Sequence, residues 1–177
     1  MNSYTLNKNN SEVEYKIGKV KRLHKNNLNI LIKESKQNKR KRKRYCLHDN
    51  VADPVHEMFI VHSKNTYIRP HLHKDRAESI LILDGKIKYL IFNSKGKLKD
   101  VFLMTSLSNS RNAFYNRIKK DTYHSLIILS DTVTFLEITK GPFKKDSTKF
   151  AKWSPREESD TQGIKFLERK LKDYYEK

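Results

Sequence analysis

Two histidines and a glutamate are grouped within residues 71–85 at a spacing that suits metal binding. His71 and His73 are two residues apart, and in an extended segment the side chains at positions i and i+2 project from the same face. After a short charged turn, Glu78 begins another apolar run that ends at Gly85. Neutral imidazoles and a carboxylate form a mixed nitrogen and oxygen ligand set for a divalent transition metal. This segment therefore predicts a metal site.

A third histidine, His124, lies in the segment Asp-Thr-Tyr-His-Ser-Leu and can supply another nitrogen from a distant strand. We expect His71, His73, Glu78 and His124 to be the metal ligands, with Glu78 bound either directly or as a group that orients a water or an imidazole. Imidazole-rich sites accept several first-row ions, so the metal is iron, zinc, manganese or nickel.

The composition describes one domain with an uneven positive charge. The chain has 177 residues, of which 36% are hydrophobic, and its net charge is +18. A chain of this length normally forms one domain. Residues 1–44 contain 14 Lys/Arg against 3 Asp/Glu, a net charge of +11, so most of the excess is N-terminal. The single cysteine, Cys46, excludes an internal disulfide and is expected to be buried rather than nucleophilic.

Nothing in the sequence indicates a membrane span or a secretory signal. No segment approaches the roughly 18 apolar residues that a spanning helix needs. The first ten residues are polar and have no apolar core of a signal peptide. We therefore expect a cytoplasmic protein.

The pattern of apolar residues predicts an all-β body with a C-terminal helix. Residues 11–34 alternate around Val20 and through Leu28, Ile30 and Ile32, which predicts two short strands with a turn at 25–27. Turn residues at 84–85 and 93–96 separate further short strands, as in a sandwich or barrel. The predicted strands are Met58–His62, Tyr67–His73, Ser79–Leu83, Ile87–Phe92, Val101–Met104, Ser125–Leu129 and Val133–Ile138. Residues 164–174 have helical spacing and predict an amphipathic helix.

The first motif is similar to that of the cupins, in which a glycine precedes H-x-H, a glutamate and a second glycine. Asn65 stands where the first glycine is usual. The second cupin motif usually has a proline and a glycine before its histidine, whereas this chain has Lys119 and Asp121, and Ile128 replaces a common asparagine. We therefore expect a turn of another type before His124.

More narrowly, the chain resembles the WbuC family of cupin-fold metalloproteins. The segments that carry this resemblance lie between about residues 40 and 158, and they are Asp53-Pro-Val, Tyr67-Ile-Arg-Pro-His-Leu-His73, Glu78, Tyr123-His-Ser-Leu126, Phe135-Leu-Glu137, Gly141-Pro-Phe143 and Phe150-Ala-Lys-Trp-Ser-Pro155. The resemblance implies a cupin-type jelly-roll barrel, metal binding and a place in bacterial surface-polysaccharide metabolism. The organisation expected is a basic N-terminal extension with edge strands at 1–39, a cupin domain at 40–158 and a C-terminal helix at 159–177. A homodimer is expected, because jelly-roll edges commonly pair.

Three residues besides the ligands are candidates for the cavity. Arg69 is two residues before His71 and should share its face, where a guanidinium can clamp a carboxylate or phosphate, unless it pairs with a structural carboxylate such as Glu137. Tyr67 would lie on the same face and could act in catalysis together with Glu78. His48 precedes the first core strands and is a candidate for substrate binding.

Residues 39–44 form a run of six cations, Lys-Arg-Lys-Arg-Lys-Arg. Clustered cations bind nucleic acids through phosphates, but no helix-turn-helix, aromatic RNA-binding signature or zinc finger accompanies the run. We do not expect a nucleic-acid partner. Arg42 or Arg44 can instead belong to the edge of the barrel, or the run can attract anionic sugar nucleotides or polymers.

The ligand set leaves positions open on a metal that prefers five or six ligands. A sugar or sugar-nucleotide derivative with two oxygens can chelate there, and the metal then acts as a Lewis acid in isomerisation, epimerisation or hydrolysis. A proton-transfer base is required, and the sequence nominates Tyr67, His48 or Glu78. Two alternatives stay open: an iron-dependent dioxygenase and a cupin that binds a small molecule without catalysis.

Overall fold

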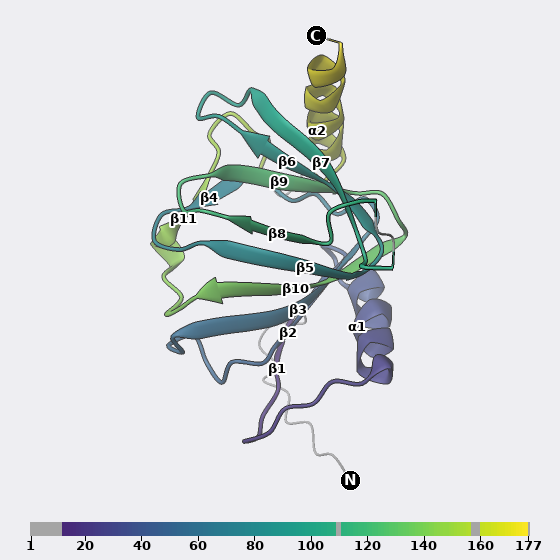
Figure 1. The fold of residues 1–177 in the computed structure, drawn as a ribbon, viewed down its shortest axis with the longest axis vertical. Helices are drawn as coiled ribbons and strands as arrows, with labels where there is room; N and C mark the ends of the chain where they lie inside the picture. The colour runs from purple at the N-terminus through teal and green to yellow at the C-terminus, as the bar shows by residue number, and fades with distance from the viewer. Residues whose placement is uncertain (1–11, 109–110, 157–159, 177) are drawn as a thin grey trace.

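The structure is a computed structural model and describes residues 12–108, 111–156 and 160–176. Within these ranges most of the regular structure is β-sheet, with two α-helices and one short 3₁₀ turn (Figure 1). The elements in chain order are β1 (Val13–Tyr15), α1 (Lys25–Gln37), β2 (Arg42–Cys46), β3 (Val55–Ser63), β4 (His71–His73), β5 (Glu78–Asp84), β6 (Lys86–Phe92), β7 (Leu98–Thr105), β8 (Tyr115–Ile118), β9 (Tyr123–Ile128), β10 (Thr132–Lys140), η1 (Lys145–Ser147), β11 (Thr148–Phe150) and α2 (Asp160–Tyr175).

The strands form two facing sheets, and the chain passes repeatedly from one to the other. The first sheet has the order β1-β2-β3-β10-β5-β8 and the second the order β11-β4-β9-β6-β7. Neighbouring strands are antiparallel except for β1 and β2. This order is a jelly roll, the double-stranded β-helix of the cupins. The predicted fold class, an all-β jelly-roll barrel with a short C-terminal helix, is confirmed.

The core lies between the sheets because each strand alternates inward apolar residues with outward ones. Phe135, Ile60 and Ile82 come from three neighbouring strands of the first sheet and are at most 2% exposed. Ile87 and Tyr89 face them from β6 of the second sheet and are fully buried. These apolar side chains fill one part of the space between the sheets, and the cavity described below occupies the rest.

The N-terminal region differs from the prediction. A short strand, β1, lies at Val13–Tyr15, but the strand predicted around Val20 is absent, and the second predicted strand and its turn are replaced by helix α1. The predicted turn at 25–27 is the first turn of this helix. Leu28, Leu31 and Ile32 pack toward β2 and β3, whereas Ile30 is 54% exposed. The alternation through 28, 30 and 32 was thus part of a helical pattern, because residue 31 is apolar too.

One further strand prediction needs correction, and three strands were missed. The strand expected at Tyr67–His73 is ordered as a strand only over His71–His73, and residues 67–70 approach it as an irregular segment. Strands β2, β8 and β11 were not predicted. Each is five residues long or shorter and rich in polar residues, so none has the apolar alternation that marks a half-buried strand.

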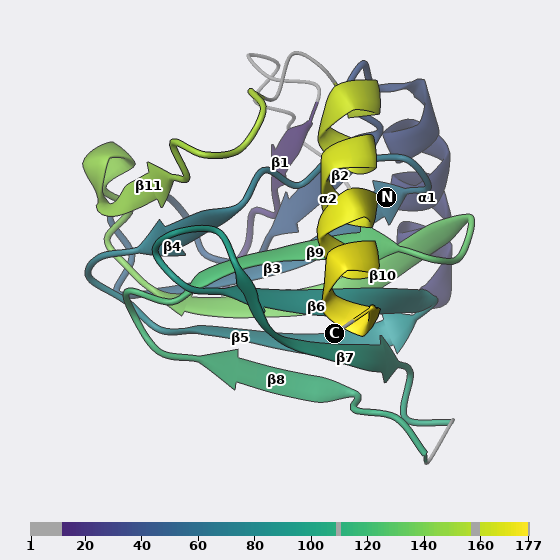
Figure 2. The same ribbon diagram turned by 90° about the horizontal axis from the view of Figure 1, so that it is seen from above.

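The C-terminal helix α2 covers the outer face of the second sheet, while α1 covers the first (Figures 1 and 2). Leu167 of α2 is buried in a cluster with Leu90, Phe92 and Tyr67. A Cβ at Gly163 would lie 2.3 Å from the ring of Tyr67, so glycine allows α2 to approach the barrel closely. None of the helices in the described part of the chain is long and apolar enough to cross a membrane.

Three positions in the two motifs adopt left-handed backbone conformations. Gly85, in the turn between β5 and β6, has φ of 88°. Asn65 and Asp121, which stand where cupin motifs usually have glycine, have φ of 67° and 62°. Asparagine and aspartate tolerate this region better than other non-glycine residues. The turns that precede His71 and His124 therefore keep a backbone conformation usual for glycine, although the residues differ.

Candidate metal centre

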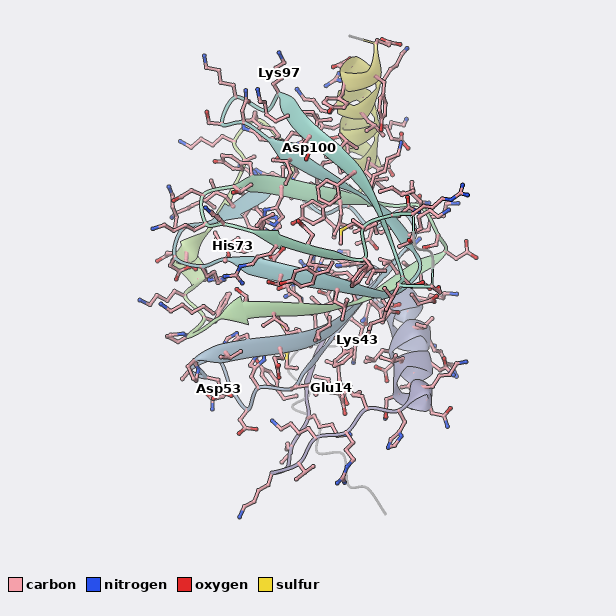
Figure 3. All side chains as sticks on the ribbon, in the orientation of Figure 1. Glu14, Lys43, Asp53, His73, Lys97 and Asp100 are labelled. Atoms are coloured by element: carbon pink, nitrogen blue, oxygen red, sulfur yellow. The ribbon has the colours of Figure 1, made fainter. Side chains whose placement is uncertain are left out.

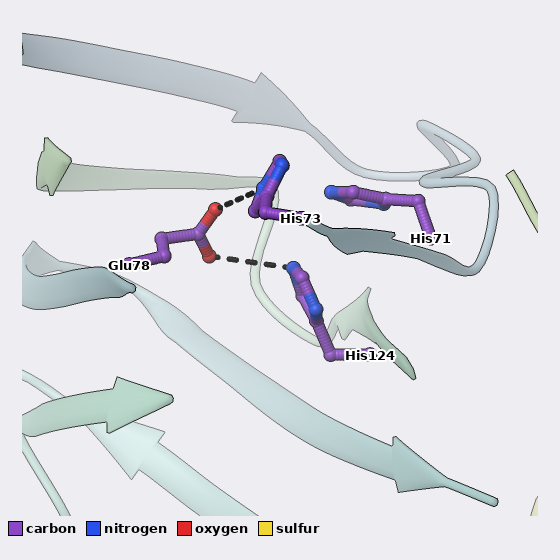
Figure 4. Close-up of side chains that lie close together, drawn as sticks. All are labelled: His71, His73, Glu78 and His124. Atoms are coloured by element: carbon purple, nitrogen blue, oxygen red, sulfur yellow. Dashed lines mark hydrogen bonds and ion pairs between the residues drawn. The ribbon is translucent and has the colours of Figure 1, made fainter. Parts of the chain in front are cut away.

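Four side chains from three strands converge at one end of the space between the sheets. His71 and His73 belong to β4, and His124 of β9 lies directly opposite His71 in the antiparallel pair. Glu78, the first residue of β5, reaches them from the other sheet (Figure 4). One ligand atom from each of the four residues lies within 4.8 Å of the others. The structure thus brings together all four residues that the sequence proposed as ligands.

The histidines are held so that the same ring nitrogen of each faces the centre. Nδ1 of His71 donates to the carbonyl of Arg69 at 2.8 Å, and Nδ1 of His124 donates to the carbonyl of Thr122 at 2.9 Å. A carbonyl only accepts, so Nδ1 carries a proton, and Nε2 is the nitrogen with the lone pair whenever the ring is neutral. Nδ1 of His73 is 3.1 Å from Oγ1 of Thr148, which can accept in the same way. These outer contacts fix the tautomer that a metal requires.

Glu78 bridges two of the histidines. Its Oε2 is 3.0 Å from Nε2 of His73, and its Oε1 forms an ion pair with Nε2 of His124 at 3.4 Å (Figure 4). The hydroxyl of Tyr89 donates to Oε1 at 3.5 Å. Glu78 and His124 are 5% and 3% exposed. The carboxylate is therefore directed at the centre of the cluster, and the hydrogen bond from Tyr89 helps to hold it there.

The pKa values follow from burial and from charge within the cluster. Burial lowers the pKa of His71 to about 3, and the charge of His124 acts in the same direction. Burial alone would raise the pKa of Glu78, but the charge of His124 and the contacts from both histidines hold it well below its usual value. Burial opposes the charged form of His124, but Glu78 raises its pKa above the ordinary value. At neutral pH the cluster thus presents a neutral imidazole at His71 and a carboxylate at Glu78.

These residues fit a divalent transition metal. Three imidazole nitrogens and one carboxylate are the donors that first-row ions prefer. Nε2 of His124 is buried, and its contact with Oε1 of Glu78 at 3.4 Å is an ion pair without hydrogen-bond geometry. A metal held between these two atoms would replace that ion pair and bind both the imidazole and the carboxylate.

The cluster opens into a cavity of about 350 Å³ between the sheets. The cavity wall carries many more cations than carboxylates. Its carboxylates are Glu78 and Glu137, and its cations are Arg40, Arg42, Arg44, Arg69, Arg76, Lys140 and Lys145. Such an excess of positive charge in a recess favours anionic ligands.

Glu137 is a carboxylate of the cavity that sequence reasoning did not propose as a site residue. It lies on β10, two residues before Thr139, which is paired with Glu78. Burial and the nearby charge of Glu78 raise the pKa of Glu137 to about 7. The signal in the sequence was a single acidic residue inside the apolar run 133–138, which is unusual unless the carboxyl group faces a polar cavity.

Arg69 lines the cavity, as expected, but does not pair with Glu137. Its Nε donates to Oγ of Ser154 at 3.2 Å, and its terminal nitrogen donates to the carbonyl of Ala151 at 3.0 Å. Its guanidinium lies 5.0 Å from the ring centre of Phe150. These contacts tie the end of β11 to the segment before β4, so Arg69 positions this part of the cavity wall.

Tyr67 and His48 were proposed as cavity residues, and both lie elsewhere. Tyr67 is 2% exposed, donates to the carbonyl of Pro155 at 3.1 Å and packs against α2 on the outer side of the second sheet. It points away because the chain is irregular from 67 to 70, so the i, i+2 rule for strands does not hold there. His48 does not line the cavity itself but stacks at 4.0 Å on His56, which does.

The comparisons by sequence are limited. A family model described as a domain of unknown function, DUF6016, matches residues 23–104, which is less than half of the chain. No curated protein sequence matches the chain.

Solved structures with similar folds include enzymes and a protein without an assigned activity. An oxalate decarboxylase of Bacillus subtilis is 17% identical with a TM-score of 0.45, over 56% of this chain and 25% of that one. A putative sugar phosphate isomerase of Acidithiobacillus ferrooxidans is 16% identical with a TM-score of 0.41, over 50% and 51%. An uncharacterised double-stranded β-helix protein of Klebsiella pneumoniae is 11% identical with a TM-score of 0.48, over 63% and 84%. The chain thus spans only a quarter of the decarboxylase, and at these identities the matches say nothing about its reaction.

Proposed function

We propose that this protein is a metal-dependent enzyme that acts on a small, anionic, oxygen-rich molecule, a sugar or sugar-nucleotide derivative. The observation that carries the proposal is the convergence of His71, His73, Glu78 and His124 within 4.8 Å at the end of a cationic cavity. The tautomers set by the outer hydrogen bonds support it, because they direct Nε2 of the histidines to one point.

A divalent metal held by these residues would supply a Lewis acid to oxygen atoms of the substrate. The other requirement of isomerisation, epimerisation or hydrolysis is a group that takes up and returns a proton. Glu137 supports this role better than Tyr67 or His48, because it lines the cavity and its pKa is about 7. It is two residues along β10 from the position paired with Glu78, or about 7 Å. We therefore assign proton transfer to Glu137 and metal binding to Glu78.

Three further parts of the proposal rest on the sequence. The resemblance to the WbuC family supports a role in surface-polysaccharide metabolism, which we include in the proposal. A cytoplasmic location is a further part of the proposal, because the single cysteine excludes an internal disulfide and so fits a reducing compartment. A homodimer follows from the tendency of jelly-roll edges to pair, and analytical ultracentrifugation tests it.

The first experiment is elemental analysis of the untagged protein together with the variant in which His71, His73 and His124 are replaced by alanine. We expect close to one transition metal per chain in the wild type and none in the variant. The variant His24→Ala is the matched control, because it removes an exposed imidazole far from the cluster. A wild-type protein that contains no metal and takes none up on reconstitution would overturn the proposal.

Activity is tested separately from metal binding. Turnover of candidate nucleotide sugars should require the metal and should be lost in the His71→Ala and His73→Ala variants. Tight binding of a sugar ligand without turnover would instead favour a binding protein. Consumption of oxygen by the iron-loaded protein would favour the dioxygenase.

A further inference from the structure

The basic run at 39–44 is not a loose arm, because its second half is strand β2 and its residues alternate between two sides. Lys43 and Tyr45 face outward toward α1, and Lys43 pairs with Glu34 of α1 at 2.8 Å. Lys43 also pairs with Glu14 of β1 at 3.5 Å; both residues are labelled in Figure 3. Arg42 and Arg44 project from the opposite side of β2 and line the cavity. The alternation of a strand therefore converts half of the run into a cationic wall inside the barrel.

The register places this wall at the far end of the cavity from the metal cluster. Arg44 is paired with Ile60 of β3, and Ile60 is paired with Phe135 of β10. Glu78 is paired with Thr139, four residues further along β10, or about 13 Å. Glu137 lies midway between these two rows. A ligand that reached both ends of the cavity would pass beside it.

The cations of the wall differ in their partners. Glu12 accepts from Arg40 at 2.8 Å and from Arg42 at 3.1 Å. The buried Nε of Arg44 has no hydrogen-bond partner among the described residues. Nδ1 of His62, which is paired with Arg42 and also lines the cavity, is buried without a partner as well. Buried donors normally have acceptors, so the Nε–H of Arg44, and Nδ1 of His62 in the tautomer that protonates it, can donate to an acceptor that enters the cavity.

From this arrangement we infer that Arg44, with Arg42 and His62 beside it, binds a phosphate group of the substrate while the opposite end of the same molecule lies at the His71 cluster. This inference rests on the proposed function, since it names the class of substrate: a phosphorylated, oxygen-rich small molecule. A phosphate presents several acceptor oxygens and two negative charges, and a guanidinium binds it in a bidentate manner.

A small molecule fits these observations better than a nucleic acid. The Nε of Arg44 is buried within a cavity of about 350 Å³, which lies within the usual size range of small-molecule sites. A duplex cannot enter such a recess, and the outward lysine of β2 that could meet one is already paired with Glu14 and Glu34.

The test is the binding of inorganic phosphate to the full chain, measured by calorimetry before and after treatment with a chelator. We expect binding to persist after chelation and to weaken at least about tenfold in Arg44→Gln, because a charge-assisted contact is lost. Arg44→Lys keeps the positive charge but loses the bidentate geometry of the guanidinium, so its affinity for phosphate should lie between those of the wild type and Arg44→Gln. Lys99→Gln removes an equal charge from an exposed position of β7 and should bind as the wild type does.

The outcomes separate this inference from the proposed function. Loss of phosphate binding in Arg44→Gln, with the metal content and the unfolding midpoint unchanged, would support the phosphate site. An equal loss of phosphate binding in Lys99→Gln would overturn the phosphate site. So would tighter binding of malonate, or of a DNA duplex, than of phosphate. If the wild type contains no metal but phosphate binding is intact in it and in His71→Ala, the phosphate site stands and only the proposed metal-dependent activity is overturned.

Discussion

Replacement of Glu137 by glutamine should stabilise the metal-free protein at alkaline pH and leave it almost unchanged at acidic pH. Burial, followed by the charge of Glu78, raises the pKa of Glu137 from 4.5 to about 7. The folded state therefore binds more protons than the unfolded state between these two values, and stability falls as the pH rises through this interval. Glutamine has nearly the same shape as the neutral carboxylic acid, so it removes the titration with little change in packing.

The size of the effect follows from the displacement of the pKa. A difference of about 2.5 pH units, at about 1.4 kcal/mol per unit, corresponds to about 3 kcal/mol lost by the wild type above the folded-state pKa. The wild type and Glu137→Gln should thus have similar free energies of unfolding near pH 5, and the variant should be more stable by about 2 to 3 kcal/mol near pH 8. Such a change is a large part of the stability of a domain of this size.

The assay is urea unfolding of chelator-treated protein, followed by circular dichroism across this pH range. Glu57→Gln is the matched control, because Glu57 is an exposed carboxylate on the neighbouring strand β3. Added metal should reduce the difference, since a cation beside Glu78 favours the ionised form of Glu137. A stability difference between the wild type and Glu137→Gln that does not change with pH would refute the reasoning.

Three further predictions concern the elements that hold the cavity. Leu31→Ala should lower the free energy of unfolding in urea by about 3 kcal/mol, because Leu31 is 3% exposed on the face of α1 that packs against β2 and β3. Ile30→Ala, on the exposed face of α1, should change it by less than about 1 kcal/mol, and equal effects of the two substitutions would contradict the helix. Gly163→Ala should lower the melting temperature, because the new Cβ would lie 2.3 Å from the ring of Tyr67, and an unchanged melting temperature would show that α2 is not packed there. Cys46 should react with a thiol reagent only on unfolding, because burial raises the pKa of its thiol to about 12. Rapid reaction of Cys46 in the native protein would contradict its burial.

The ligands on one segment could be predicted because their signal is local. His71 and His73 share a face wherever the chain is extended, and Glu78 follows within a few residues. His124 was proposed as a third nitrogen without knowledge of its partner strand, and the structure places it opposite His71. Asn65 and Asp121 show that a turn can keep its left-handed conformation without the glycine by which the motif is usually recognised.

The errors arose where local patterns had more than one solution. The apolar residues of 28–32 suit both a strand and one face of a helix, and the packing of Leu31 against β2 and β3 decides for the helix. Tyr67 was placed by a rule that holds only in regular strands, and the segment from 67 to 70 is irregular. His48 was assigned to the cavity by its place in the chain, but it lies behind His56, which lines the cavity and on which it stacks.

The sequence by itself determined the kind of chemistry that this chain offers: imidazole and carboxylate donors at a strand spacing, an excess of arginine and lysine, and the alternation of a β-barrel. Only the tertiary structure decided that Glu137 and Arg44 share one cavity with the His71 cluster. Both residues reach it through the register of strands that are distant in the chain, from β2 through β3 and β10 to β5. Register depends on how two sheets bury their apolar faces together, and a shift of one residue would turn each of these side chains to the opposite side.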